Sequence, residues 1–386
     1  MRVLDRANNE TVTELISNSS GQTATIDLAA PPVDYSLMGN QGQPYSEYDI
    51  AVEADGFEPV RVNGIQILPQ TSAYQTIQLI SSAAPQAQPR ECNVKANTLW
   101  GDFPPKTPED DVKPLPADKG FVVLPQPVIP EFIIVHDGLP NNASAQNYWV
   151  PFKDYIKNVG SSEIYATWPE PTIEANILAI LSFTLNRVYT EWYRGRGYDF
   201  TITSSTAYDH AFNYGRNIFS EISRVVDRLF NKYITRPDIR QPLFTQYCDG
   251  RKSQCPNWMT QWGSKDLGDK GYSSMEILKS FYGYDIFLME ADRVEGVPAS
   301  YPGYHLQMGS TGAAVRTIQE QLNAISNNYP AIKKMPVDGI YGQATLDAVT
   351  TFQQVFNLPT TGIVDMPTWY RISHIYVAVT RIAELQ

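Results

Sequence analysis

Two stretches near the C-terminus decide the fold of the last part of the chain: LQMGSTGAAVRTIQEQL at residues 306–322 and DGIYGQATLDAVTTFQQ at residues 338–354. Each stretch carries an apolar stripe at helical spacing, made of Val315, Ile318 and Leu322 in the first and Leu346, Val349 and Phe352 in the second. Glycines separate the periodic segments, where turns need positive φ angles. We therefore expect residues 304–386 to form a three-helix bundle.

The same region resembles the small helical peptidoglycan-binding domain found at the ends of many wall hydrolases. The resemblance covers residues 304–372 and is carried by segments such as Asp338-Gly339-Ile340-Tyr341-Gly342 and Thr368-Trp369. A generic three-helix bundle with tidy turns, the plainer alternative, does not need those pieces at these spacings. The resemblance implies peptidoglycan glycan strands as the ligand, with Asp338, Gly339, Tyr341 and Trp369 as contact residues.

Length and composition bound the rest of the chain. Its 386 residues are enough for several domains, and we expect a multidomain α+β protein. The net charge of −11 argues against nucleic acid as a partner. The 23 tyrosines and 7 tryptophans offer flat rings that can pack on sugars. The sequence contains no run of 18 apolar residues, so no membrane span is predicted, and residues 1–20 hold no signal peptide. We expect the cell wall, the extracellular space or a phage-like particle as the location.

Residues 1–80 predict a β-sandwich, with strands at 25–28, 48–52 and 76–79 separated by Gly, Pro and Asn. Residues 48–60 resemble the strand–turn–strand of carboxypeptidase-regulatory-like domains. This resemblance implies that the first strand of such a domain is missing here. A missing strand would leave an unpaired edge that can accept a protein partner, although a sandwich without a partner is the simpler interpretation. Residues 81–130 are rich in proline, which favours an extended linker.

Residues 131–290 predict a central α+β domain, with a strand at 132–136 and helices at 174–193, 217–233 and 273–282. Three blocks, beginning at Val159, Asp199 and Met259, resemble the stage II sporulation protein D family. Members of that family cleave glycan strands as lytic transglycosylases, and others are described as amidase enhancers. The family's catalytic acid falls on Glu163.

Glu163 can serve this chemistry alone. A protonated carboxyl group donates to the glycosidic oxygen, and the carboxylate then takes the proton of the sugar's own 6-hydroxyl. The pKa of Glu163 must be raised for this, and Tyr165 and Trp168 lie close enough in sequence to form a desolvated pocket. Gln261, in the third block, is expected to contact the substrate. The plainer interpretation of Glu163 is a solvent-exposed residue at a helix start.

The chain departs from the family pattern at three positions. Glu174 stands where the family has a lysine, and Leu181 stands where it has an arginine, for which Arg187 is a substitute from another face. Cys255 stands in the place of a family histidine. The loss of these groups favours a protein that binds glycan without cutting it.

Cys248 and Cys255 enclose six residues. A local disulfide suits an extracellular wall protein and is the favoured interpretation, with two free thiols and a zinc site completed by His210 as alternatives. No cofactor is expected.

These observations lead to two functional hypotheses from different classes. In the first, the protein binds peptidoglycan and cleaves its glycan strands at Glu163. In the second, it is a non-catalytic wall-docking or scaffold component. A part of a phage tail or injection particle is compatible with either.

Overall fold

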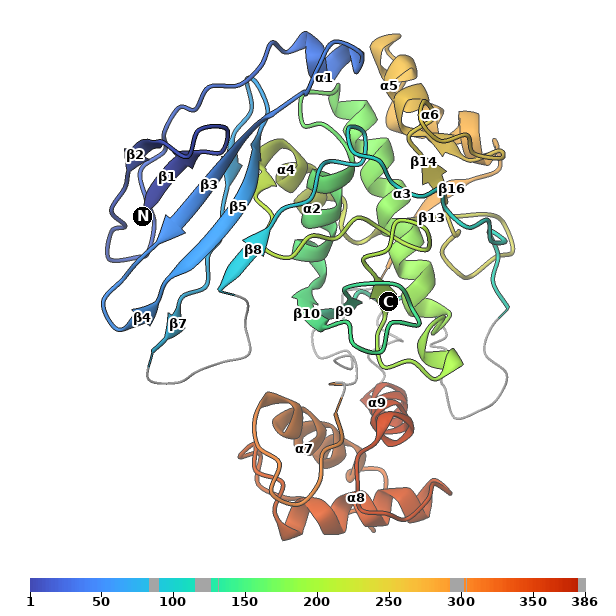
Figure 1. Cartoon of the computed structure of the whole chain (residues 1–386). Coiled ribbons are helices and arrows are strands. Elements are labelled where there is room, and N and C mark those ends of the chain that lie inside the picture. The colour runs from blue at the N-terminus through green and yellow to red at the C-terminus, as the bar shows by residue number, and fades with distance from the viewer. Residues whose placement is uncertain (83–89, 115–125, 131, 292–301, 303, 381–386) are drawn as a thin grey trace.

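The computed structural model describes residues 1–82, 90–114, 126–130, 132–291, 302 and 304–380 (Figure 1). Buried apolar side chains gather into an N-terminal core, a central core and a C-terminal core. The chain is therefore a mixed α+β protein with helices and several small sheets, the class that the sequence predicts. Within the described residues, no helix is both long enough and apolar enough to cross a membrane.

A five-stranded sheet with strand order β2-β1-β3-β5-β8 organises the N-terminal region. Its strands are β1 (Arg2–Asp5), β2 (Thr11–Glu14), β3 (Ser46–Val52), β5 (Val60–Ile67) and β8 (Glu91–Asn93). Neighbours run antiparallel except β5 and β8, which run parallel. Val3, Ile50 and Val62 belong to the N-terminal core, as expected for side chains that share one face of a sheet.

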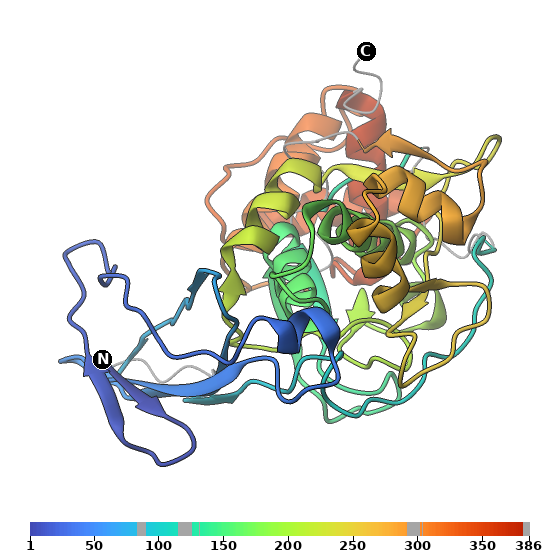
Figure 2. The same ribbon diagram turned by 90° about the horizontal axis from the view of Figure 1, so that it is seen from above.

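The sandwich predicted for residues 1–80 is wrong in its second layer. Of the three predicted strands only 48–52 is one, within β3, while residues 25–28 and 76–79 are irregular. Ile26, Leu28 and Ile77 still pack against the N-terminal core, so their apolar character reflects burial without a strand partner. Figure 2 shows the sheet as a single layer beside the helical body. The predicted protein partner at its edge stays a prediction.

Two small ribbons tie this sheet to its surroundings. The strands β4 (Phe57–Glu58) and β7 (Ile80–Ser81) pair with each other, whereas β6 (Ala73–Tyr74) pairs with β12 (Ile218–Phe219) of the central region. The short helix α1 (Asp34–Met38) also reaches the central region, because the indole Nε1 of Trp168 donates to the main-chain oxygen of Ser36 at 3.0 Å. The N-terminal and central regions therefore share hydrogen bonds as well as a chain connection.

The central region is built around one buried helix. Its helices are α2 (Phe152–Glu163), α3 (Glu170–Tyr189), α4 (Ser220–Leu229), α5 (Gln261–Asp269) and α6 (Ser274–Tyr282), with a 3-10 turn at Arg194–Arg196. Helix α3 packs against the other four and is buried along most of its length (Figure 1). It begins four residues before the expected start at Glu174, because Pro171 occupies a first-turn position that needs no N–H.

Short sheets close the central region. The strands are β9 (Phe132–His136), β10 (Asn147–Pro151), β11 (Ile202–Thr203), β13 (Lys232–Thr235), β14 (Tyr247–Cys248), β15 (Met259–Thr260) and β16 (Phe287–Glu290). They form the sheet β10-β9-β11 and the pairs β13-β16 and β14-β15. The strand predicted at 132–136 is β9, and the predicted helix at 273–282 is α6, which Ser273 and Glu276 start with a capping box.

The linker predicted for residues 81–130 is wrong for residues 90–114, which we call the strap. The strap pairs with the N-terminal sheet through β8 and then follows the central region, where Thr107 N donates to Ala207 O at 2.7 Å and Phe244 N donates to Asp111 O at 2.9 Å. Proline excludes helix from such a segment but leaves its other backbone groups free to bond to neighbours. Residues 83–89 and 115–125 of the predicted linker lie outside the described residues.

The C-terminal region forms a bundle of α7 (Ala313–Ile325), α8 (Gln343–Val355) and α9 (Met366–Thr380) around its own core, as the sequence predicts. Two buried glutamines hold its loops in the same way. Gln319 accepts from Gly339 N at 2.8 Å and donates to Ile340 O at 3.0 Å. Gln353 accepts from Gly362 N at 2.8 Å and donates to Ile363 O at 2.9 Å. The bundle thus contains two similar helix–loop units.

Candidate functional site

Glu163 is the last residue of α2, and its carboxyl group points into the protein. The side chain is only 2% exposed. One carboxyl oxygen accepts a hydrogen bond from Ala211 N at 2.6 Å, and the other accepts one from the Tyr247 hydroxyl. The side chain of Gln261 donates to the main-chain oxygen of Glu163 at 3.0 Å. The plainer interpretation of Glu163 as a solvent-exposed residue at a helix start is wrong, since Glu163 is buried and ends the helix.

Close helix packing fixes the place of Glu163. Gly160 lies one turn earlier in α2, and a Cβ atom there would lie 2.7 Å from Ile177 of α3 and 2.8 Å from Ile222 of α4. A side chain at this position would push α2 away from both helices. The glycine therefore lets α2 end deep in the central region, where its terminal carboxyl group is removed from solvent.

A pocket opens beside this carboxyl group. Its walls come from the strap, from the end of α2, from the loop before α4 and from the segment that contains the cysteine pair. The lining residues are Thr98, Phe103, Pro104, Lys106, Glu163, Thr206, Tyr247, Cys248, Asp249, Ser253 and Gln261. Glu163 and Gln261, two of the residues expected at the site, thus lie together in one pocket.

Burial raises the pKa of the Glu163 carboxyl group above its ordinary value. Three neighbours oppose this effect and lower that pKa: first the charge of Lys106, then the hydrogen bonds from Tyr247 and from Ala211 N. The carboxyl group therefore combines burial, which favours its protonated form, with donors that stabilise its ionised form. This balance is suited to a group that must both give and take a proton.

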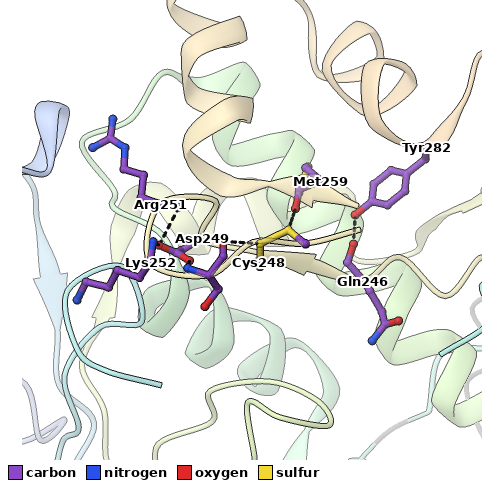
Figure 3. Close-up of a disulfide and its surroundings, with 9 residues drawn as sticks. Gln246, Cys248, Asp249, Arg251, Lys252, Met259 and Tyr282 are labelled. Atoms are coloured by element: carbon purple, nitrogen blue, oxygen red, sulfur yellow. Dashed lines mark hydrogen bonds between the residues drawn. A yellow bond between two sulfur atoms is a disulfide. The ribbon is translucent and has the colours of Figure 1, made fainter. Parts of the chain in front are cut away.

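The loop that joins β14 to β15 is drawn in Figure 3. Asp249 and Ser253 of this loop line the pocket. Cys248 and Cys255 are joined by a disulfide, with Cα atoms 6.0 Å apart. The carboxylate of Asp249 accepts from the backbone N–H groups of Lys252 and Ser253, each at 2.7 Å, which closes the loop into a turn. Because both sulfurs are used in the disulfide, the thiolates of the alternative zinc site are absent. Among the described residues, no group of three or more His, Cys, Asp or Glu is placed to hold a metal ion.

The strap and this loop are held together. The ammonium of Lys252 donates to the main-chain oxygen of Gly101 at 3.0 Å and to that of Trp100. The guanidinium of Arg251 lies 3.5 Å from the centre of the Trp262 ring. The two walls of the pocket are therefore fixed relative to one another by polar contacts.

The expected roles of Tyr165 and Trp168 at the pocket are wrong. Both side chains are buried, at 1% and 3% exposure, and pack with Trp262 in an aromatic cluster that does not line the pocket. Residues close in sequence to Glu163 point elsewhere because the chain turns sharply between α2 and α3. The groups that surround the carboxyl group come instead from distant segments, namely Lys106, Ala211 and Tyr247.

The three residues that the predicted resemblance aligns with cations, Glu174, Leu181 and Arg187, do not line the pocket. Glu174 lies near the surface and pairs with Arg228, and Leu181 is fully buried in the central core. Arg187, the suggested substitute, is buried in an ionic network, where its guanidinium bonds Asp209 at 2.8 Å and Glu109 at 2.6 Å. Arg187 therefore acts on the architecture beside the pocket.

Three ionisable residues of the pocket were not predicted from the sequence: Lys106, Tyr247 and Asp249. Lys106 follows a Pro-Pro pair in a tract that predicts only an extended chain, so no local signal pointed to it. Tyr247 and Asp249 flank Cys248, and the chemistry of the cysteine pair was the nearest available signal.

In the C-terminal bundle, two expected ligand contacts are core residues. Tyr341 is 0% and Trp369 1% exposed, and the Tyr341 hydroxyl donates to Gly362 O at 2.8 Å. Gly339 is also buried, while Asp338 is exposed and bonds Gln319 at 2.9 Å. Of the four expected contacts, Asp338 alone presents its side chain at the surface.

Comparison with known proteins identifies the C-terminal region. Residues 311–372 match the family model described as a putative peptidoglycan binding domain. A solved structure, titled "The crystal structure of SleB N-terminal domain", is 27% identical over 19% of this chain and 93% of its own, with a TM-score of 0.17. No curated protein matches the chain. The chain thus carries a peptidoglycan-binding domain, which supports association with the cell wall.

Proposed function

We propose that this protein binds peptidoglycan through its C-terminal bundle and cleaves the glycan strands at Glu163 by lytic transglycosylation. The observation that carries the proposal is the buried carboxyl group of Glu163, which lies at a pocket. The pKa of this carboxyl group is raised, and it accepts hydrogen bonds from two donors. The family match over residues 311–372 supports the substrate, because it concerns peptidoglycan. The proposed location is the cell wall or the extracellular space, or a phage-like particle.

The proposed reaction needs one carboxyl group. Protonated Glu163 gives its proton to the glycosidic oxygen as the bond from that oxygen to the anomeric carbon breaks. The sugar's 6-hydroxyl oxygen then bonds to the anomeric carbon, and its proton passes to the Glu163 carboxylate. The products are a strand with a new hydroxyl end and a strand with a 1,6-anhydro end. Tyr247 and Ala211 N orient the carboxyl group, since each donates to one of its oxygens.

A second candidate is a wall-docking or scaffold protein without catalysis. It is favoured by the 2% exposure of Glu163, which lies behind the strap, and by Glu174, Leu181 and Cys255 in place of cationic or histidine groups. A role in a phage tail or injection particle is compatible with either candidate. In the scaffold case the pocket would bind glycan, or nothing, and the C-terminal bundle would carry the function.

Mass spectrometry of products from purified sacculi distinguishes the two candidates. Wild-type protein should release fragments with anhydro ends, and Glu163→Gln should lower the rate on the order of 10²–10⁴-fold while co-sedimentation with sacculi stays unchanged. Glu290→Gln, at an exposed ion pair on β16, is the matched control and should keep full activity. If wild type yields no anhydro ends, the scaffold candidate is correct. If Glu163→Gln cleaves at the wild-type rate, another carboxyl group acts, with Asp249 the other one at the pocket.

A further inference from the structure

Lys106 brings a positive charge to the pocket from the strap. Its ammonium donates to the main-chain oxygen of Asp209 and to that of Thr206 at 3.5 Å. It lies 4.9 Å from the ring centre of Tyr247 and 5.5 Å from that of Phe183. Within the described part of the chain, Lys106 forms no ion pair within 4.0 Å. Burial lowers the pKa of the Lys106 ammonium, and the charge of Glu163, followed by that of Asp209, opposes this effect. A cation in such surroundings is costly unless a charge nearby compensates it.

The neighbouring carboxylates are already compensated. Asp209 is paired with Arg187 at 2.8 Å and also accepts from the Tyr193 hydroxyl at 2.6 Å. Glu109 is paired with Arg187 at 2.6 Å and with Lys113 at 3.0 Å. Of the two carboxyl groups that line the pocket, Asp249 accepts from the backbone N–H groups of Lys252 and Ser253. Glu163 has no cation within 4.0 Å among the described residues, so it is the carboxyl group whose ionised form the Lys106 ammonium can stabilise.

We propose that Lys106 is a positioning residue for glycan cleavage, whose ammonium stabilises the carboxylate that Glu163 becomes when it gives up its proton. This inference rests on the proposed function. Before the proton transfer, Glu163 is neutral and gains little from the ammonium. After the transfer, the two groups form an ion pair in a site shielded from water, so the interaction strengthens as the reaction proceeds. When the 6-hydroxyl proton returns to Glu163, the pair dissolves and the site is restored.

Three ionisable side chains close to Glu163 and Lys106, those of His210, Tyr155 and Tyr247, keep a constant charge near neutral pH. Burial, with smaller contributions from Lys106 and Arg187, lowers the pKa of His210 well below its ordinary value, so this side chain is neutral. Burial raises the pKa values of Tyr155 and Tyr247 well above 10, so both hydroxyls keep their protons. Asp209 and Arg187 are locked in their own pair. A change in titration near neutral pH therefore reports on Glu163 and on the Lys106 charge beside it.

The test removes the charge of Lys106 and follows Glu163 directly. Protein labelled with ¹³C at the glutamate side-chain carboxyl is titrated by NMR, and the Glu163 signal is the one that Glu163→Gln removes. Lys106→Met should move the Glu163 midpoint to higher pH, because the ammonium lowers that pKa in wild type. The same variant should lower kcat on the order of 10²-fold with little change in KM, and Lys106→Arg should restore part of both effects. Lys95→Met, at a 59% exposed side chain on the same strap, should change neither.

The outcomes separate this inference from the proposed function. A folded Lys106→Met protein with an unmoved midpoint overturns the inference whether or not wild type cleaves glycan. A raised midpoint with an unchanged kcat overturns it too, because the charge would then have no part in catalysis. A wild type without cleavage refutes the proposed function, on which the inference rests, while the midpoint still reports the electrostatic contact. If Lys106→Met fails to fold by circular dichroism, Lys106→Gln keeps a donor for the Asp209 oxygen and replaces it in both assays.

Discussion

Glu163→Gln should make the central region more stable at neutral and alkaline pH, although it should abolish the proposed activity. Glutamine resembles the protonated carboxyl group in shape. Its oxygen can accept from Ala211 N and its amide can donate to the Tyr247 hydroxyl oxygen, so both contacts of Glu163 are kept in altered form. The variant therefore isolates the cost of ionising a buried carboxyl group, and that cost depends on pH.

The sign of the effect follows from the raised pKa of Glu163 in the folded protein. Below the ordinary pKa of about 4.5, the carboxyl group is protonated in the folded and unfolded states, and the variant should match wild type. Above it, the unfolded chain loses the proton first, so wild-type stability falls as pH rises until the folded-state pKa is passed. The advantage of Glu163→Gln should therefore grow across this window and then level off.

The magnitude depends on how far burial lifts the folded-state pKa. Each pH unit between the two pKa values corresponds to about 1.4 kcal/mol of unfolding free energy. In a region of this size, about 1 kcal/mol shifts the melting temperature by roughly 2–4 °C. Lys106 limits the rise in pKa, so the effect should be larger when Lys106→Met is also present.

Differential scanning calorimetry of the full chain between pH 4 and pH 8.5 measures this difference. The transition of the C-terminal bundle, which has its own core, serves as an internal reference that the substitution should not move. The reasoning would be contradicted if Glu163→Gln were no more stable than wild type at pH 8, or if the stability difference were the same at all pH values. Either result would show that the carboxyl group ionises as it does in water. The burial that supports both the proposed catalysis and the role of Lys106 would then be refuted.

Three further predictions concern other parts of the chain. Replacing Cys248 and Cys255 by serine should lower stability by about 2–3 kcal/mol, measured by urea denaturation, and alkylation of wild-type protein before reduction should label neither residue. Arg187→Met should cost about 3–5 kcal/mol in the same assay, because it leaves the buried carboxylate of Asp209 without its ion-pair partner and removes one of the two cations paired with Glu109. Residues 304–386 alone should co-sediment with sacculi. Gly339→Ala should weaken this binding by unfolding the bundle, which a lower melting temperature would show. The reason is that φ is +75° at Gly339 and the added Cβ would lie 3.2 Å from a backbone oxygen.

The elements of this fold that sequence predicts best are those set by local periodicity. Helices α7 and α8 carry their apolar stripes on the residues expected, and β9 spans the expected residues. The prediction of an N-terminal sandwich is wrong because strands depend on contacts between distant parts of the chain. Apolar residues such as Ile26 and Ile77 are partly buried against the N-terminal core. A strand also needs a neighbour with free backbone groups, and that neighbour is set by contacts distant in sequence.

The candidate site shows the same division. Glu163 was found through a motif, since its place at the end of α2 depends on nearby residues such as Gly160. Lys106 and Tyr247 come to it from 57 and 84 positions away, along a strap and a loop whose paths no short pattern encodes. The same distance explains why Tyr165 and Trp168, adjacent in sequence, were wrongly placed at the pocket.

The C-terminal signature illustrates why a motif can identify a domain without naming its ligand contacts. Gly339 and Gly362 each donate a backbone N–H to a buried glutamine, and Tyr341 crosses between the two loops to reach the Gly362 carbonyl. These residues brace the two helix–loop units from inside. Their pattern therefore predicts the bundle, whereas the glycan must be recognised by side chains left at the surface. Ile340, between two buried neighbours, is 54% exposed, and Asp338 is exposed beside it. The search for the wall-binding surface should therefore start at this turn rather than at the aromatic residues of the signature.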